Sequence, residues 1–139
     1  MSLVYLLTPR RAPENGKRIY IGKTSRGDKI RLKEHNGIRR GGAKKTRKYR
    51  PWMVVATVSG FASDNDALKF EWIWQHPYES RITKKYLKEQ LVGKRGFGGL
   101  YTVKRKLIEI KLIIRTFFPY LKLRIKSKKW IDMLPSIPL

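Results

Sequence analysis

Three short apolar runs, separated by residues that favour turns, mark the first half of the chain. Residues 3–8 (LVYLLT) and 19–24 (IYIGKT) are typical of β-strands, and the Pro-, Asn- and Gly-rich stretch 9–18 between them predicts a hairpin with a long loop. The run at 51–61 (PWMVVATVSGF) is apolar almost throughout, which predicts a third strand buried on both faces. The pattern therefore predicts a small, largely antiparallel sheet.

Two helices are expected around these strands. In the first, Ser25 or Asp28 supplies the cap, Ile30 falls on the inner face, and the Asn-Gly pair at 36–37 ends the helix. The second, over 63–77, opens with Ser-x-x-Asp, which resembles a capping box, and closes at a proline that a helix interior would not tolerate. Its apolar residues lie nearly all round, so we expect this helix to be central.

The C-terminal part of the chain predicts further helices over 81–92 and 100–118, with a Gly-rich turn at 93–99 between them. The longer helix carries a core-facing stripe of apolar residues at helical spacing: Val103, Leu107, Ile110 and Ile114. In 119–130 apolar and basic residues alternate, which is the pattern of a half-exposed strand.

These elements predict an α/β (α+β) fold in which a three-stranded, mostly antiparallel sheet is flanked by helices, with additional C-terminal helices. No repeat or linker divides the chain, so we expect one domain over 1–139, with a core at about 3–78 and a helical extension at about 79–131.

Charge is the strongest compositional signal. The chain has 33 Lys and Arg residues against 10 Asp and Glu, a formal net charge of +23. A field of that sign attracts polyanions, and a nucleic-acid backbone is the usual one. An anionic membrane surface is the weaker alternative, because no predicted helix is cleanly basic on one face and apolar on the other.

Basic residues concentrate in 39–50 (RRGGAKKTRKYR), which holds seven of them, no acid and two glycines. Such a segment reads as a flexible loop that cannot bury itself and is suited to contact phosphates. The residues that we expect to bind DNA are Lys23, Arg39, Arg40, Lys44, Lys45, Arg47, Lys48 and Arg50.

The chain has no cysteine and two histidines, which excludes a disulfide framework and a thiolate zinc site. No apolar stretch is long enough to cross a bilayer, and no signal-peptide pattern opens the chain. We therefore expect a soluble, intracellular protein that binds no membrane.

Glu71 is the most informative single residue, because it is one of few acids and lies within the apolar stretch FEWIW. A buried, unpaired carboxylate would cost several kcal/mol. One reading is a structural acid that pairs with a nearby cation or lies at the helix edge. The other is a hard oxygen ligand that holds Mg²⁺ or Mn²⁺ beside a phosphate.

Four other residues could take part in chemistry. Tyr5 and Tyr20 lie on the two hairpin strands, where tyrosines usually pack, but two facing phenols could also position a water and help remove its proton. Arg31 is either a solvated cation or a residue whose guanidinium neutralises charge on a phosphate. His35, four residues along the same helix, is a base or a helix-end residue, and the sequence does not separate these two roles.

Together these residues resemble the GIY-YIG nuclease superfamily. The first triplet stands as LVY (3–5), with Leu3 where the family usually has Gly, and the second stands intact as YIG (20–22). The ordered segments RIYIGKT, RLKEHNG, GGAKKTR, RPWMVV and FEWIWQHP, within a resemblance over roughly 3–130, are similar to the catalytic subunits of the eukaryotic Slx structure-selective endonucleases.

The resemblance implies a role for each matching position. Tyr5 and Tyr20 match the motif tyrosines, which contact the attacking water. Arg31 matches the arginine that stabilises the pentacovalent phosphate, Glu71 matches the single metal-binding glutamate, and His35 is a helper at this site.

The resemblance also implies the reaction, which is divalent-metal-dependent hydrolysis of DNA phosphodiester bonds. Its substrates would be branched double-stranded DNA, such as 5′-flaps, replication forks and Holliday junctions, in DNA repair and recombination in the nucleus. It implies a scaffold or regulatory subunit as partner. The RING-type zinc domain that follows the nuclease domain in the eukaryotic subunit is not expected here, since the chain has no cysteine.

Two other functions stay open from the sequence. One is a catalytically silent basic module that keeps the fold and binds nucleic acid. The other is a GIY-YIG nuclease of the viral or mobile-element type, whose sequence-specific cleavage would need a separate recognition domain.

Overall fold

The computed structural model describes residues 1–10, 18–91 and 102–126, and it is built on one antiparallel sheet. The sheet comprises β1 (Leu3–Pro9), β2 (Tyr20–Thr24), β3 (Trp52–Ser59) and β4 (Lys122–Ile125). The strand order is β2-β1-β3-β4, so the hairpin of β1 and β2 places β2 at one edge. The predicted Gly-rich turn at 93–99 and much of the hairpin loop lie outside the described residues.

The prediction of a three-stranded sheet is wrong, because β4 pairs with β3 as a fourth strand. The alternation at Leu121, Leu123 and Ile125 did predict a half-exposed strand. Alternation shows which residues face inward, but it does not show which strand supplies the hydrogen-bonding partner. The four strands make the sheet wide enough to separate two layers of helices.

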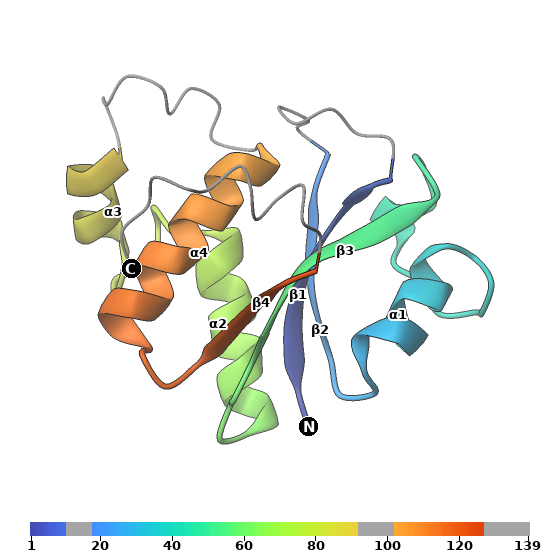
Figure 1. Cartoon of the computed structure of the whole chain (residues 1–139), viewed down its shortest axis with the longest axis horizontal. Helices are drawn as coiled ribbons and strands as arrows, with labels where there is room; N and C mark the ends of the chain where they lie inside the picture. The colour runs from blue at the N-terminus through green and yellow to red at the C-terminus, as the bar shows by residue number, and fades with distance from the viewer. Residues whose placement is uncertain (11–17, 92–101, 127–139) are drawn as a thin grey trace.

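Helices cover the two faces of the sheet unequally (Figure 1). The helix α1 (Asp28–His35) lies on one side, whereas α2 (Asp64–Gln75), α3 (Lys84–Leu91) and α4 (Val103–Phe117) lie on the other. On the α1 side, Tyr5, Leu7 and Trp52 form a small apolar cluster. The main core occupies the opposite face.

Two details of α1 differ from the prediction. Ile30 is 37% exposed, so it does not face inward. Gly27 occupies the N-cap with a φ of +91° and no side chain caps the helix, so neither Ser25 nor Asp28 takes that place. A positive φ at the cap favours glycine over a polar capping residue.

The helix α2 begins as predicted, since the Ser63 hydroxyl accepts a 3.1 Å hydrogen bond from the backbone N–H of Asp66. Phe70 and Trp74 are fully buried, but Leu68 and Trp72 are nearly half exposed. The expectation that α2 is central therefore holds for only part of its surface. Its sheet-facing side is core, and one side lies open.

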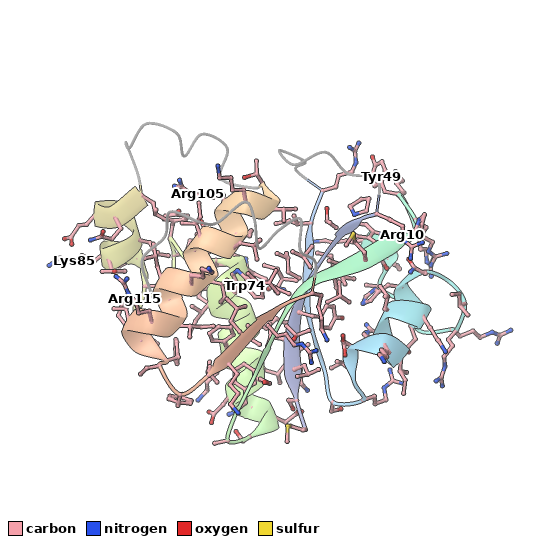
Figure 2. All side chains as sticks on the ribbon, in the orientation of Figure 1. Arg10, Tyr49, Trp74, Lys85, Arg105 and Arg115 are labelled. Carbon is pink, nitrogen blue, oxygen red and sulfur yellow. The ribbon has the colours of Figure 1, made fainter. Side chains whose placement is uncertain are left out.

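The helices α2 and α4 are joined by a reciprocal pair of hydrogen bonds. The Trp74 indole N–H donates to the Lys106 carbonyl at 3.2 Å, and the Lys106 ammonium donates to the Trp74 carbonyl at 2.9 Å. Figure 2 shows Trp74 on the α4 side of the sheet. Beside this pair, the buried Glu109 carboxylate lies 3.1 Å from Lys106 and 3.8 Å from Arg105. Burial raises the pKa of Glu109, which the neighbouring cations partly offset.

The apolar stripe of α4 is confirmed, since Val103, Leu107 and Ile110 are fully buried and Ile114 is half-buried.

Within the described segments, no helix has the length and apolar character that crossing a membrane requires.

Candidate active site

Cross-strand register brings the two tyrosines together on the α1 side of the sheet. Tyr5 on β1 lies opposite Gly22 on β2, and the rings of Tyr5 and Tyr20 are 6.4 Å apart. A Cβ at position 22 would lie 2.4 Å from the Tyr5 hydroxyl oxygen. Gly22 is therefore required for the Tyr5 ring to lie flat across β2 beside Tyr20.

His35, the last residue of α1, continues this cluster. Its ring is fully buried, with its centroid 4.9 Å from the Tyr20 ring and 5.8 Å from the Tyr5 ring. The Tyr5 hydroxyl lies 2.8 Å from Nε2 of His35, and Nδ1 lies 2.9 Å from the Thr46 hydroxyl.

The hydrogen-bond chain assigns the tautomer of His35. The Thr46 hydroxyl donates to the Ala43 carbonyl at 2.8 Å, so its oxygen accepts from Nδ1–H of the histidine. Nε2 then carries no proton and accepts from Tyr5. The hydrogen bonds thus run in one direction: the Tyr5 hydroxyl donates to His35, the His35 ring N–H donates to the Thr46 hydroxyl, and that hydroxyl donates to the Ala43 carbonyl.

Burial keeps these groups uncharged. It lowers the pKa of His35 to about 4, and the positive charge of Arg31 acts in the same direction. Burial also raises the pKa of both Tyr5 and Tyr20. Arg31 opposes that rise and Glu71 adds to it. At neutral pH the site therefore presents two phenols and a neutral imidazole.

Arg31 is held in place by contacts to its own helix and to the basic loop. Its guanidinium donates to Glu34 Oε1 at 3.2 Å and to the Gly41 carbonyl at 2.6 Å. The Glu34 carboxylate, which is 3% exposed, also accepts two hydrogen bonds from Arg26, at 2.6 and 2.9 Å. Burial opposes ionisation of Glu34, but the two arginines outweigh it and lower its pKa. The Arg31 side chain retains 20% exposure, so it can meet a ligand.

Glu71 lies on α2 and thus belongs to the layer across the sheet from α1. It is half-buried beside the edge strand β2, and among the described residues its carboxylate accepts no hydrogen bond. Burial raises its pKa, and the charge of Lys23 on β2 opposes that rise. Its charge also adds to the raised pKa of both tyrosines.

The donor set at this edge suits a hard cation that keeps most of its own ligands. The described residues hold no group of three His, Cys, Asp or Glu side chains that could enclose a metal. Mg²⁺ is often held by one or two carboxylates, with waters and substrate phosphates completing its shell. The half-buried carboxylate of Glu71, which has no hydrogen-bond donor in the described part of the chain, fits that role.

The basic segment 39–50 is more ordered than its composition predicts. It contains a short 3₁₀ helix, η1 (Lys44–Thr46), and Thr46 is fully buried. The Trp52 indole N–H donates to the Thr46 carbonyl at 2.9 Å, and a Cβ on Gly42 would collide with the Glu34 carbonyl. The expectation that this loop cannot bury itself is therefore wrong at Thr46, and Thr46 and Gly42 anchor the loop on α1 and β3.

The predicted DNA-binding residues divide into two groups. Lys23 is ion-paired to Asp64 at 2.5 Å with a side chain 14% exposed, and Arg50 donates to the His35 carbonyl at 2.7 Å. The others lie on the loop and, like Arg50, are exposed: Arg39, Arg40, Lys44, Lys45, Arg47 and Lys48. An open cavity of about 370 Å³ is lined in part by Arg39, Arg40 and Arg47.

Sequence reasoning missed Glu34 and Thr46, which position Arg31 and His35. Glu34 had a detectable signal, because an acid three residues after Arg31 on a helix forms an ion pair. Thr46 had none, since a single threonine in a basic loop is ordinarily solvated.

Comparisons with known proteins match this chain to one family and to several relatives. The family described as "GIY-YIG catalytic domain" matches residues 1–86. A "Structure-specific endonuclease subunit SLX1" of Debaryomyces hansenii is 40% identical over 118 residues, which cover 83% of this chain and 32% of that protein. Proteins with the same description in Eremothecium gossypii and Schizosaccharomyces japonicus are 40% identical over 108 residues and 46% identical over 77 residues.

These matches cover 75% and 55% of this chain, but 34% and 27% of the two relatives. The chain therefore spans about a third or less of the length of these curated relatives.

Proposed function

This chain belongs to the GIY-YIG catalytic-domain family, and on that premise we propose that it is a structure-selective DNA endonuclease that uses one divalent metal ion. The observation that carries the proposal is the cluster at the edge of the sheet. Tyr5, Tyr20, His35 and Arg31 gather on one face of β2, and Glu71, whose half-buried carboxylate accepts no hydrogen bond from the described residues, lies on α2 on the other side of the sheet.

Arg31 is the group that meets the phosphate. Its guanidinium is partly exposed and is oriented by Glu34 and by the Gly41 carbonyl. Charge builds on the non-bridging oxygens during attack at phosphorus, and a fixed guanidinium stabilises that charge. Because Glu34 already holds one side of the Arg31 guanidinium, the Arg31 side chain loses less rotational freedom when the phosphate binds.

The two tyrosines take different roles, since Tyr20 is half-buried and Tyr5 is 2% exposed. Tyr20 orients the attacking water. Tyr5 and His35 accept its proton: as the Tyr5 oxygen takes a proton from the water, the hydroxyl proton of Tyr5 passes to Nε2 of His35. Thr46 keeps the imidazole in the tautomer that this transfer needs.

Glu71 is the residue that would hold the metal. A bound Mg²⁺ or Mn²⁺ would supply positive charge beside the phosphate and the leaving oxygen. Burial raises the pKa of Glu71 and the charge of Lys23 opposes that rise, so a bound cation would further offset the cost of burying this carboxylate.

Branched DNA is the substrate that we propose. The relatives are described as subunits of structure-specific endonucleases, and the exposed cations of the loop at 39–50 make contacts that ignore base sequence. We further propose 5′-flaps, forks and Holliday junctions as targets, a role in nuclear DNA repair and recombination, and a partner subunit. The word "subunit" in the relatives' descriptions supports the partner.

The test compares the unmodified chain with Glu71→Gln on 5′-flap, fork, four-way-junction and linear duplex DNA, in Mg²⁺ or Mn²⁺. We expect nicking of the branched DNAs by the unmodified chain, and binding without nicking by Glu71→Gln. Glu89→Gln, the same change at an exposed position on α3, should cleave normally. If folded protein binds every branched DNA in a salt-sensitive way and cleaves none, it is a silent binding module.

A further inference from the structure

A cleft of about 250 Å³ opens beside the tyrosine cluster, where the C-terminal end of α2 meets the start of β2. Tyr20 lines it and thus belongs to both the cluster and the cleft. Its other polar walls are Lys45, Gln75, His76 and Lys106. The Gln75 amide donates to the Ile21 carbonyl at 2.9 Å and thereby fixes this end of α2 against β2.

Trp72 adjoins His76, one of the residues that line this cleft. Its ring stacks on His76 at a centroid distance of 4.8 Å and an interplanar angle of 28°. The other two tryptophans in the described part of the chain, Trp52 and Trp74, are buried and donate their indole N–H groups to carbonyls. Trp72 is 46% exposed and, within the same part of the chain, its indole N–H has no acceptor.

The Trp72–His76 stack and the cleft would bind different parts of one nucleotide. An exposed tryptophan backed by a second ring is a surface on which a nucleobase stacks, and every base has a face for it. Lys45 places positive charge in the cleft, where a backbone phosphate would lie, whereas the Lys106 ammonium is engaged by the Trp74 carbonyl and by Glu109. The volume is below the roughly 300–1,000 Å³ of sites for drug-sized ligands, so it suits one nucleotide better than a long segment.

We propose that the cleft and the Trp72–His76 stack form a subsite for one unpaired nucleotide next to the bond that is cut. This inference rests on the proposed nuclease function and adds to it a way to select branched DNA. Duplex DNA keeps its bases stacked inside, whereas a single-stranded flap offers an unpaired base to Trp72.

The experiment uses the full chain in EDTA, so that binding is measured without cleavage. An oligothymidylate of eight nucleotides and a blunt duplex are titrated while tryptophan fluorescence is followed. We expect the oligothymidylate to quench the fluorescence. Trp72→Ala should lose that quenching and bind the oligothymidylate about 5- to 150-fold more weakly, the range measured for loss of one stacked base. Its affinity for the duplex should not change.

Leu68→Ala is the matched control, because Leu68 lies one turn earlier on α2 and is 47% exposed. It should behave as the unmodified chain, and Trp72→Phe should retain part of the affinity. Equal losses in Leu68→Ala and Trp72→Ala would identify a general apolar contact, for example with a protein, and would overturn the subsite. So would unchanged quenching in Trp72→Ala.

The inference and the proposed function fail separately. A chain that cleaves branched DNA but shows no Trp72-dependent quenching lacks the subsite and keeps the nuclease function. A chain whose quenching depends on Trp72 but that cleaves nothing has the nucleotide site without the activity.

Discussion

Gly22→Ala tests whether the packing of the two tyrosines governs activity. The added Cβ would lie 2.4 Å from the Tyr5 oxygen, 2.6 Å from Cζ of Tyr5 and 2.9 Å from Cε1 of Tyr20. Ordinary van der Waals contact begins at 3.4 Å, so the Tyr5 hydroxyl must move by about 1 Å. That movement breaks its hydrogen bond to His35.

The expected cost follows from these contacts. Overpacking costs about 1–3 kcal/mol, and the lost Tyr5–His35 bond adds about 1 kcal/mol. Replacing a flexible glycine regains about 0.4–1 kcal/mol through the unfolded state. The free energy of unfolding should therefore fall by roughly 1–3 kcal/mol, which lowers the melting temperature by roughly 4–12 °C in a chain of this size.

The cleavage rate of the folded protein should also fall, beyond what the loss of folded protein explains. Displacement of a catalytic group by 1 Å costs about 100-fold in rate, so we expect at least that loss in single-turnover cleavage of a 5′-flap DNA. Binding of the same DNA in EDTA should stay unchanged, because the exposed cations of the loop at 39–50 are not touched. Thermal unfolding, measured in parallel, reports the folded fraction.

Gly60→Ala serves as the control for destabilisation alone. Gly60 has a φ of +98° and its Cβ would meet the Tyr120 carbonyl at 3.3 Å and Leu121, but neither tyrosine of the pair. It should lower the melting temperature and leave cleavage by the folded fraction intact. If Gly22→Ala cleaves at the unmodified rate, the Tyr5 position does not control the reaction and the proposed proton path is wrong.

Three further predictions concern the groups around this pair. Glu34→Gln should lower the free energy of unfolding by about 1–3 kcal/mol and slow cleavage about tenfold, since Arg31 loses its anchor; urea titration and single-turnover kinetics measure both effects. His35 has a folded pKa of about 4 against an ordinary 6.5, so the unfolded chain takes up the proton first and stability should decline as pH falls from about 6.5 to about 4. In His35→Gln that part of the decline should disappear from urea titrations at pH 7 and pH 5. Arg39→Gln and Arg47→Gln should each lower the slope of log affinity against log salt by about 1 for any DNA sequence, and unchanged slopes in titrations at several salt concentrations would remove the loop from the DNA interface.

The sequence pattern over a few residues was enough to locate most helices and strands, because their formation depends on residues that are neighbours in the sequence. The strands around Tyr5 and Tyr20 and the cap at Ser63 could be read from runs of a few residues. The pairing of β4 with β3 could not, since that contact joins segments about 65 residues apart and no local residue encodes the partner.

The same distinction applies to the candidate site. Tyr5, Tyr20, Arg31, His35 and Glu71 were identified by residue type and motif order, and their roles remain predictions. What surrounds them was not visible in sequence, because it depends on tertiary contacts. The bond from His35 to Thr46 spans eleven positions, and the buried pairs around Glu109 contradict the usual exposure of charged residues.

The crossed hydrogen bonds between Trp74 and Lys106 determine where the chain can be shortened. The family match ends at residue 86, before α4 begins. Cutting there would strip the indole N–H of its acceptor and uncover Ala67 and Phe70, both of which are in the core that α4 helps to close. The smallest piece that keeps Glu71 in place must therefore include α4, and expression designs based on the catalytic motif alone should yield insoluble protein.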